Sequence, residues 1–129
     1  MNGIKDVRED SHEWRPIMNY DEAIEYIETV SCSGIMPGLV RIQALLEKTE
    51  HPEKKCNVIH VAGTNGKGSV CSYISSILMK AGYRVGRYVS PTLFDYRERL
   101  QINDSWISKA DTAYWMSRVR EADEKMQDE

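Results

Sequence analysis

A glycine-rich stretch, GTNGKGS at residues 63–69, constrains this 129-residue chain more than any other feature. It follows a short β-branched run at 57–62, which is too brief for a helix and lacks polar alternation, as is typical of a buried strand. An amphipathic helix is predicted over 69–81, with Gly82 as its stop, and 84–89 has the pattern of another strand. This order predicts a βαβ unit with two parallel strands and a right-handed crossover.

Two helices are expected ahead of this unit. The first begins after Asn19, a capping residue with Glu22 three positions later and apolar residues at helical spacing beyond it. The sequence SCSGIMPG then breaks the pattern. Pro37 is suited to the start of a second helix, which is expected to end before Pro52.

The remaining segments flank this unit and the two helices. Residues 1–18 are rich in charge and show no clear period, so they are expected to form a lead-in segment. The sequence LQINDSWIS predicts a small hairpin that turns at residues 103–104, and Ser108 is expected to open a last amphipathic helix. Residues 19–129 are predicted to form part of one α/β domain, because domains commonly contain roughly 100–200 residues and one domain is the most that this length allows.

Charge and hydropathy exclude several classes of partner. The net charge is −3 and the pI is about 5.7, with no basic stripe, so no nucleic-acid partner is expected. No apolar run approaches the ~18–20 residues of a membrane span, and the N-terminus is too charged for a secretory signal. We therefore expect a cytoplasmic protein without a membrane partner.

The glycine loop suits a phosphate. Between a buried strand and a helix, successive backbone N–H groups can point at one anion, and the helix dipole favours negative charge there. Lys67 adds a full positive charge, and Ser69 or a nearby hydroxyl could meet magnesium. The pattern therefore predicts a nucleotide site, with Mg²⁺ as the metal that a hydroxyl could meet. The alternative is a tight turn whose lysine is merely solvated.

The loop departs from the standard phosphate-loop spacing, because Val61 stands where a glycine is expected and Gly68 separates Lys67 from Ser69. In this form it resembles the Mur ligase superfamily, and GTNGKGS is similar in particular to the folylpolyglutamate synthase and dihydrofolate synthase family. The segments SGIMPGLVRIQALL and LMKAGYRVGRYVSPTLFDYRERLQIN are also similar to that family. The resemblance covers about residues 20–110.

The resemblance implies a set of site residues. Lys67 would be catalytic, and Ser90, in the Ser-Pro pair after the second predicted strand, would ligate magnesium. Without the resemblance, Ser90 would be read as a hydroxyl that ends a strand. The nucleotide-binding residues would be Gly63, Thr64, Asn65, Gly66, Lys67, Gly68 and Ser69. The residues lining the dihydropteroate or folate site would be Gly34, Ile35, Met36 and Pro37, which could equally form a plain interhelical turn.

Three further positions bear on the resemblance. Thr92 stands where the family usually has histidine, which leaves the role of that histidine open here. Glu98 and Arg99 match the family's Glu-Arg pair, although a run such as YRER is more often a solvated face.

The resemblance also implies a fold and an activity. The fold is the N-terminal part of a P-loop, mostly parallel-sheet, Mur-ligase-like ATPase domain preceded by two helices. The activity is ATP-dependent ligation of L-glutamate to a folate or dihydropteroate carboxylate through an acyl phosphate. We expect the rest of the central domain and the C-terminal domain to be absent and structurally required, so that this chain alone is inactive. The alternatives are a nucleotide-binding remnant or regulatory module without catalysis and, more distantly, a kinase of another P-loop family.

Overall fold

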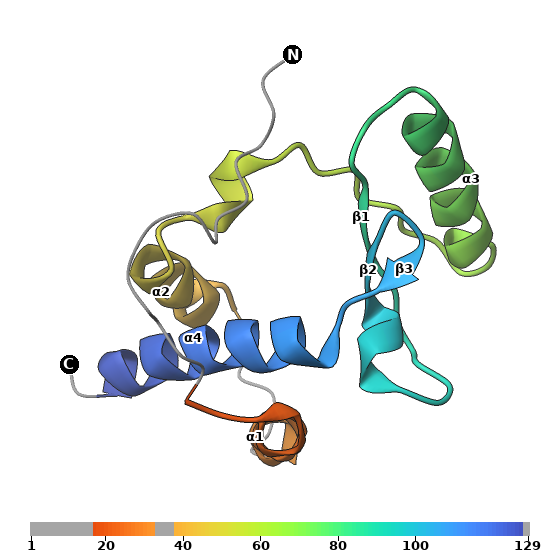
Figure 1. Ribbon diagram of the computed structural model, residues 1–129. Helices are drawn as coiled ribbons and strands as arrows, with labels where there is room; N and C mark the ends of the chain where they lie inside the picture. The colour runs from red at the N-terminus through yellow and green to blue at the C-terminus, as the bar shows by residue number, and fades with distance from the viewer. Residues whose placement is uncertain (1–16, 33–37, 128–129) are drawn as a thin grey trace.

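The computed structural model describes residues 17–32 and 38–127 (Figure 1). Its elements in chain order are α1 (Tyr20–Cys32), α2 (Val40–Lys48), a 3₁₀ turn (Pro52–Lys55), α3 (Lys67–Lys80), β1 (Gly86–Tyr88), a second 3₁₀ turn (Tyr96–Arg99), β2 (Leu100–Ile102), β3 (Ser105–Trp106) and α4 (Lys109–Gln127). Most of the predicted lead-in segment lies outside the described residues. None of the described helices is both long and apolar enough to cross a membrane, and a cytoplasmic location remains a prediction.

The starts of α1 and α4 agree with the sequence. The backbone N–H of Asn19 donates to Glu22 Oε2 at 2.7 Å, and the N–H of Glu22 donates to Asn19 Oδ1 at 3.0 Å. This reciprocal pair is the predicted capping box. At α4, Ser108 Oγ accepts from the N–H of Asp111 at 2.9 Å. Both predicted helix starts are therefore confirmed.

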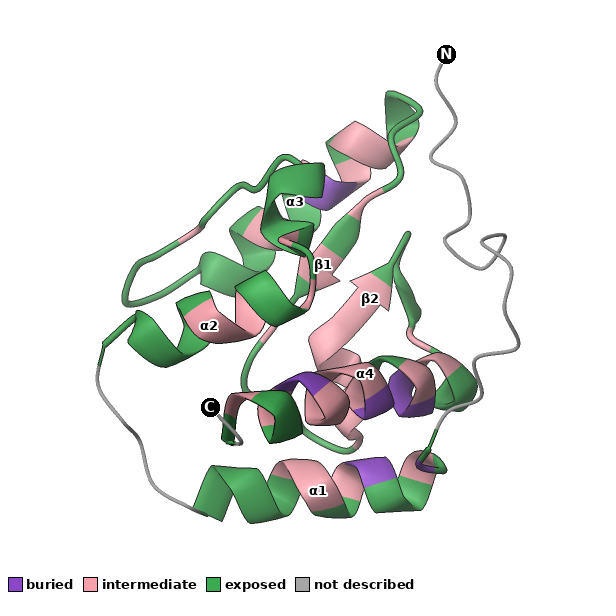
Figure 2. Cartoon of the chain, turned by 90° about the vertical axis from the view of Figure 1, so that its left-hand side faces the viewer, coloured by how far each residue is buried: buried purple, intermediate pink, exposed green. Residues whose placement is uncertain are grey.

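The buried core lies mainly where α1 meets α4, and α4 also packs against α2 (Figure 2). Apart from Met18, its buried residues are small, notably Ala23 on α1 and Ala113 and Ser117 on α4. Small side chains let two helix backbones approach closely. Ser117 Oγ accepts from the N–H of Met18 at 3.1 Å and donates to the carbonyl of Ala113 at 2.8 Å, so a buried hydroxyl joins α4 to the segment before α1.

The three strands form one antiparallel sheet in the order β1-β2-β3. Tyr88 pairs with Leu100, and Ile102 pairs with Ser105 across a two-residue turn. The turn residues Asn103 and Asp104 have φ of 48° and 60°, as a type I′ hairpin requires at both central positions. The predicted hairpin at 103–104 is confirmed.

The predicted βαβ unit is wrong for the described residues. Segment 57–62 forms no strand, and Val58 and Ile59 are 75% and 61% exposed instead of buried. Residues 86–88 do form a strand, but its partner is the antiparallel β2. A β-branched run becomes a strand only when a neighbouring strand takes its hydrogen bonds, and among the described residues no strand pairs with 57–62.

Helix α3 begins two residues earlier than predicted and stops where predicted. Gly82 has φ of 88°, its N–H donates to the carbonyl of Met79, and the N–H of Tyr83 donates to that of Leu78, both at 3.0 Å. Such a left-handed glycine is a common helix stop. Figure 1 shows α3 beyond the small sheet, away from α1, α2 and α4. Three of its large apolar side chains are correspondingly exposed, namely Val70, Tyr73 and Ile77.

Candidate functional site

The glycine loop leads directly into α3. Gly66 is the residue before the helix and has φ of 76°, in the left-handed region that favours glycine, and Gly63 also has a positive φ of 152°. No side chain caps this helix end. The N–H groups of the first turn, which have no partner within a helix, are therefore left for water or a ligand.

The side chain of Lys67 turns back across the loop. Its Nζ donates to the carbonyl of Gly63 at 2.6 Å and to that of Thr64 at 3.3 Å. The ammonium group is thus held over the loop, close to the open end of α3, rather than extended into water. A positive charge and unused N–H groups converge at one place.

The loop has room for a ligand. A Cβ placed at Gly66 or Gly68 would meet no atom within 4 Å, and all seven residues from 63 to 69 are exposed. Thr64, Asn65 and Ser69 therefore present their polar side chains at the surface beside Lys67. The residue types and the open space fit a phosphate group.

Ser90 lies two residues after β1, where its hydroxyl is already engaged. Arg99 Nη1 donates to Ser90 Oγ at 3.3 Å. Within residues 17–32 and 38–127, no group of three or more His, Cys, Asp or Glu side chains could share a metal ion. Magnesium favours several oxygen ligands including carboxylates, and a guanidinium repels a cation. The described residues around Ser90 therefore do not by themselves fit Mg²⁺.

The predicted folate-lining residues lie outside the described residues, so the structure places none of the four. Thr92, the residue that departs from the family pattern, is half-buried and lines a cavity of about 570 Å³. Segment 92–96 forms one wall of this cavity and residues of α1, including Ile24 and Glu28, form the other.

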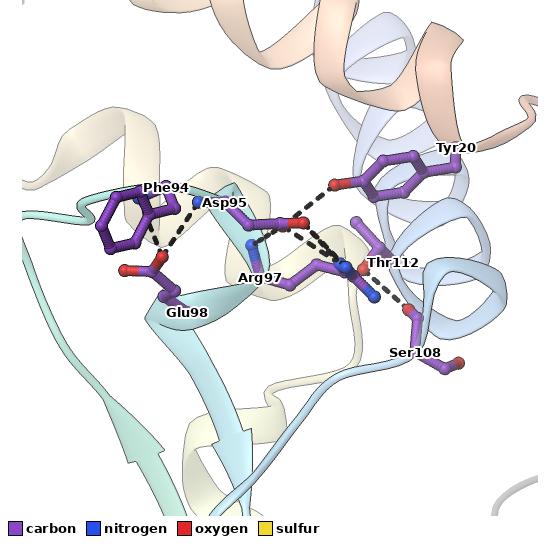
Figure 3. Close-up of polar contacts among 7 residues, drawn as sticks. All are labelled: Tyr20, Phe94, Asp95, Arg97, Glu98, Ser108 and Thr112. Carbon is purple, nitrogen blue, oxygen red and sulfur yellow. Dashed lines mark hydrogen bonds and ion pairs between the residues drawn. The ribbon is translucent and has the colours of Figure 1, made fainter.

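Glu98 holds the segment that follows Ser90, a role that the sequence did not indicate (Figure 3). Its Oε1 accepts from the N–H groups of Phe94 at 2.8 Å and Asp95 at 3.0 Å, and its Oε2 accepts from that of Leu93 at 2.8 Å. These hydrogen bonds favour the ionised carboxylate and so lower the pKa of Glu98, and the bond from the N–H of Leu93 makes the largest contribution. Glu98 is thus an anchor for the backbone and not a solvated side chain.

Asp95 links the same segment to α1. Its carboxylate accepts three side-chain hydrogen bonds and one backbone N–H bond from Arg97, and Oδ1 also accepts from Tyr20 Oη at 3.2 Å (Figure 3). The hydrogen bonds from Arg97 are the main cause that holds the pKa of Asp95 well below its usual range. The Arg97 guanidinium also lies 5.6 Å from the Tyr20 ring centroid. Asp95 thus joins this segment to Tyr20 on α1, which lies 75 positions earlier in the sequence.

A sequence signal for this arrangement exists. Asp95 and Glu98 have the Asp-x-x-Glu spacing of a capping box, and the 3₁₀ turn Tyr96–Arg99 carries that box. The pattern normally precedes a longer apolar helix, and here only a short turn follows it, so the spacing is a weak signal beside the charged run YRER. No local sequence pattern indicates the hydrogen bond between Tyr20 and Asp95.

Sequence comparison places the chain among folate enzymes. A dihydrofolate synthase/folylpolyglutamate synthase of Bacillus subtilis is 44% identical over 89 residues, which are 69% of this chain and 21% of that protein. A folylpolyglutamate synthase of Lacticaseibacillus casei is 36% identical over 110 residues, 85% of this chain and 26% of that protein. No family model matches the chain.

Structural comparison gives the same result. The folylpolyglutamate synthetase of Lactobacillus casei superposes with a TM-score of 0.79 at 35% identity, covering 87% of this chain and 28% of that one. The folylpolyglutamate synthase of Thermotoga maritima superposes with a TM-score of 0.76 at 38% identity, covering 85% and 25%. The chain thus spans about a quarter of the length of the proteins it matches.

The sequence and structural matches cover between 69% and 87% of this chain. This chain belongs to the folylpolyglutamate synthase and dihydrofolate synthase family.

Proposed function

We propose that this chain carries the nucleotide-binding loop of an ATP-dependent ligase that adds L-glutamate to a folate or dihydropteroate carboxylate. The observation that supports this best is the geometry of Lys67. Its ammonium lies over a glycine loop, 2.6 Å from the carbonyl of Gly63, at the uncapped start of α3. Solved relatives include complexes with AMPPCP, an ATP analogue, at 37% identity, and with AMPPCP and folate at 35%.

The proposed role of the loop is to hold the phosphates of ATP. The first-turn N–H groups of α3 and the residues Gly63–Ser69 would surround the phosphate oxygens, and the helix dipole would favour their charge. Lys67 would exchange its contacts with the loop carbonyls for contacts with the terminal phosphates. As a catalytic residue it would stabilise charge on the transferring phosphoryl group by position and electrostatics.

The need for ATP follows from the chemistry of the acceptor. A carboxylate does not condense with an amine in water, because its carbon is a poor electrophile and oxide is a poor leaving group. In the proposed reaction the acceptor carboxylate attacks the γ-phosphorus and ADP leaves, giving an acyl phosphate. The amine of glutamate then attacks the acyl carbon and phosphate departs. Ser90 as a magnesium ligand remains a prediction from the resemblance.

The acceptor is proposed only as a class. The relatives include enzymes named for dihydrofolate synthesis, for folylpolyglutamate synthesis and for both. The residues expected to line that site, Gly34–Pro37, are not among those described. A pterin carrying a free carboxylate is the shared feature of these substrates.

We further propose that the 129-residue chain binds nucleotide without turnover. The second candidate function, a nucleotide-binding module without catalysis, is supported by one observation. Only 21% to 26% of each of the two relatives is matched, and ligation needs the carboxylate, γ-phosphate and amine in close register.

Calorimetry with MgATP tests the loop. We expect Lys67→Ala to weaken binding by about 1–3 kcal/mol, the range for a lost charge-assisted contact. Lys80→Ala is the matched control, because Lys80 lies in the last turn of the same helix and should change the affinity little. Equal affinities for the unmodified chain and Lys67→Ala would remove Lys67 from the proposed site.

Turnover is measured separately. Phosphate release is followed with MgATP, L-glutamate and either dihydropteroate or tetrahydrofolate, using the unmodified chain. We expect binding of MgATP without acceptor-dependent release. Acceptor-dependent release would show that the chain is itself a working ligase.

A further inference from the structure

Three side chains meet at the end of β1. Arg99 Nη1 donates to Tyr88 Oη at 3.2 Å and to Ser90 Oγ at 3.3 Å. Tyr88 is 64% exposed and Ser90 is also exposed, so a ligand can reach both hydroxyls. We call Tyr88, Ser90 and Arg99 the Arg99 cluster.

The guanidinium of this cluster is held in place from two sides. The carbonyl of Arg99 accepts from the N–H of Val89 at 3.0 Å, which continues the pairing of β1 with β2 and fixes the backbone. The guanidinium carbon lies 5.2 Å from the ring centroid of Tyr96, within cation–π range. The group is therefore positioned before any ligand arrives.

Much of the donor capacity of Arg99 is unused. An arginine has five N–H donors in a planar fork, and the two hydroxyls both bond to Nη1. Nε is sheltered from solvent and has no partner among the described residues. An unsatisfied buried donor is uncommon in folded proteins and is one sign of a missing ligand or water.

The charge of Arg99 also lacks a carboxylate partner among the described residues. The contrast with its neighbours is clear: Arg97 contacts Asp95 at 2.7 Å, and Arg87 contacts Asp104 at 3.3 Å. The adjacent Glu98 offers no compensation, because both of its oxygens accept backbone N–H groups. One positive charge is left beside two accessible hydroxyls.

The hydroxyls add to the same preference. Because each oxygen accepts a bond from Nη1, its own hydrogen is free to point away from the guanidinium and donate. The cluster thus offers N–H and O–H donors around one positive charge, which suits an oxyanion such as a carboxylate or phosphate. A metal ion bound to Ser90 Oγ would instead face the guanidinium.

We propose that the Arg99 cluster binds an oxyanion, either a phosphate of the nucleotide or the carboxylate of the acceptor. The proposal rests on the proposed function, and it assigns to Arg99 a direct contact with substrate.

The test is NMR of the 129-residue chain labelled with ¹⁵N at its arginine side chains. The Nε–H of Arg99, assigned by its loss in Arg99→Lys, is followed during titration with inorganic phosphate, sodium acetate and ATP. We expect a saturable shift with at least one of these anions, weakened several-fold in Ser90→Ala. Sodium chloride at matched ionic strength should give no such shift.

Arg84→Gln is the control for general electrostatic attraction, since Arg84 is exposed and its substitution removes one positive charge outside the Arg99 cluster. It should leave the response of Arg99 unchanged. Circular dichroism of Arg99→Lys and Ser90→Ala checks that both variants keep the fold. No response to any of the three anions, or a response equal to that with chloride, would overturn the proposal. A titration with Mn²⁺ in the absence of nucleotide is a second check. Broadening of the Arg99 signal at lower Mn²⁺ concentration than the signals of other arginines would also overturn the proposal.

The arms separate the two sources of the oxyanion. A response to ATP that moves to higher concentration in Lys67→Ala assigns a nucleotide phosphate to the cluster. A response to acetate but not to ATP assigns the acceptor carboxylate.

They also separate this proposal from the nucleotide proposal. ATP binding that depends on Lys67 while Arg99 stays silent supports the nucleotide loop and overturns the cluster. If Arg99 responds to phosphate but Lys67→Ala does not change the affinity for ATP, the cluster is supported and the nucleotide loop is overturned.

Discussion

The group formed by α1, α2 and α4 and the region formed by the glycine loop and α3 differ in how their apolar faces are used. In the helix group, Ala23 and Ala113 are buried between elements and hydrogen bonds such as Met18 to Ser117 cross the interface. In the loop and α3, Tyr73 and Ile77 are 70% and 66% exposed. One region has its packing partner within the described residues, and the other shows an apolar face and a candidate ligand site together.

Stability and ligand binding are therefore expected to depend on different regions of this chain. A residue buried among neighbours contributes through packing, whereas a residue on an open face contributes little to the free energy of unfolding. The candidate site is therefore carried by the less packed region. Substitutions in the two regions should separate cleanly into those that change folding and those that change binding.

The largest effect on folding is expected at Ala113. Ala113 is 5% exposed on α4, and Leu at this position would force extra carbon atoms into the packed surroundings of α4. We expect Ala113→Leu to lower the free energy of unfolding by about 1–3 kcal/mol, the range for overpacking. Ala110→Leu, at an exposed position of the same helix, is the control and should change it little. Urea denaturation measures both, and equal midpoints would mean that α4 is not packed as described.

Local patterns predicted the helices and the hairpin well, because their signals are contained in a few consecutive residues. The Asn19–Glu22 capping box and the turn at 103–104 need no distant partner. The strand predicted over 57–62 failed for the opposite reason. Its β-branched pattern is real, but pairing is a property of two segments, and the described residues provide no second one.

The candidate site divides in the same way. The loop around Lys67 is local and was predicted residue by residue, and the structure places its ammonium over the loop. The pairing of β1 with β2 brings together Tyr88, Ser90 and Arg99. No rule of sequence spacing predicts that Arg99 donates a hydrogen bond to the hydroxyl of Ser90. The link from Tyr20 to Asp95 spans 75 positions and is equally hidden from local patterns.

A smaller and local effect is expected at Glu98. Glu98→Ala removes the acceptor of three backbone N–H groups, so hydrogen exchange at Leu93, Phe94 and Asp95 should accelerate while exchange within α4 stays unchanged. Glu98→Gln should retain part of the protection, because its remaining oxygen can still accept from Phe94 and Asp95. Unchanged exchange in Glu98→Ala would show that other contacts hold this segment.

The same segment should respond to acid. The folded-state pKa of Glu98 is lowered, so its contribution is fully present above the unfolded value of about 4.3 and is lost as pH falls through the folded value. Exchange at Leu93 and Phe94, corrected for its intrinsic pH dependence, should therefore be constant from about pH 7 to pH 5 and rise below about pH 4. A rise between pH 7 and pH 5 would contradict this assignment.

The smallest effect is expected on α3. Ile and Ser have similar helix propensities, so Ile77→Ser tests packing almost alone. Because Ile77 is 66% exposed, we expect the free energy of unfolding to change by less than about 0.5 kcal/mol. Leu78→Ser, at the half-buried neighbouring position, should cost more. Urea denaturation at several protein concentrations measures both. A loss above about 1 kcal/mol for Ile77→Ser would show that α3 is covered in solution, and the contrast between the two regions would then disappear.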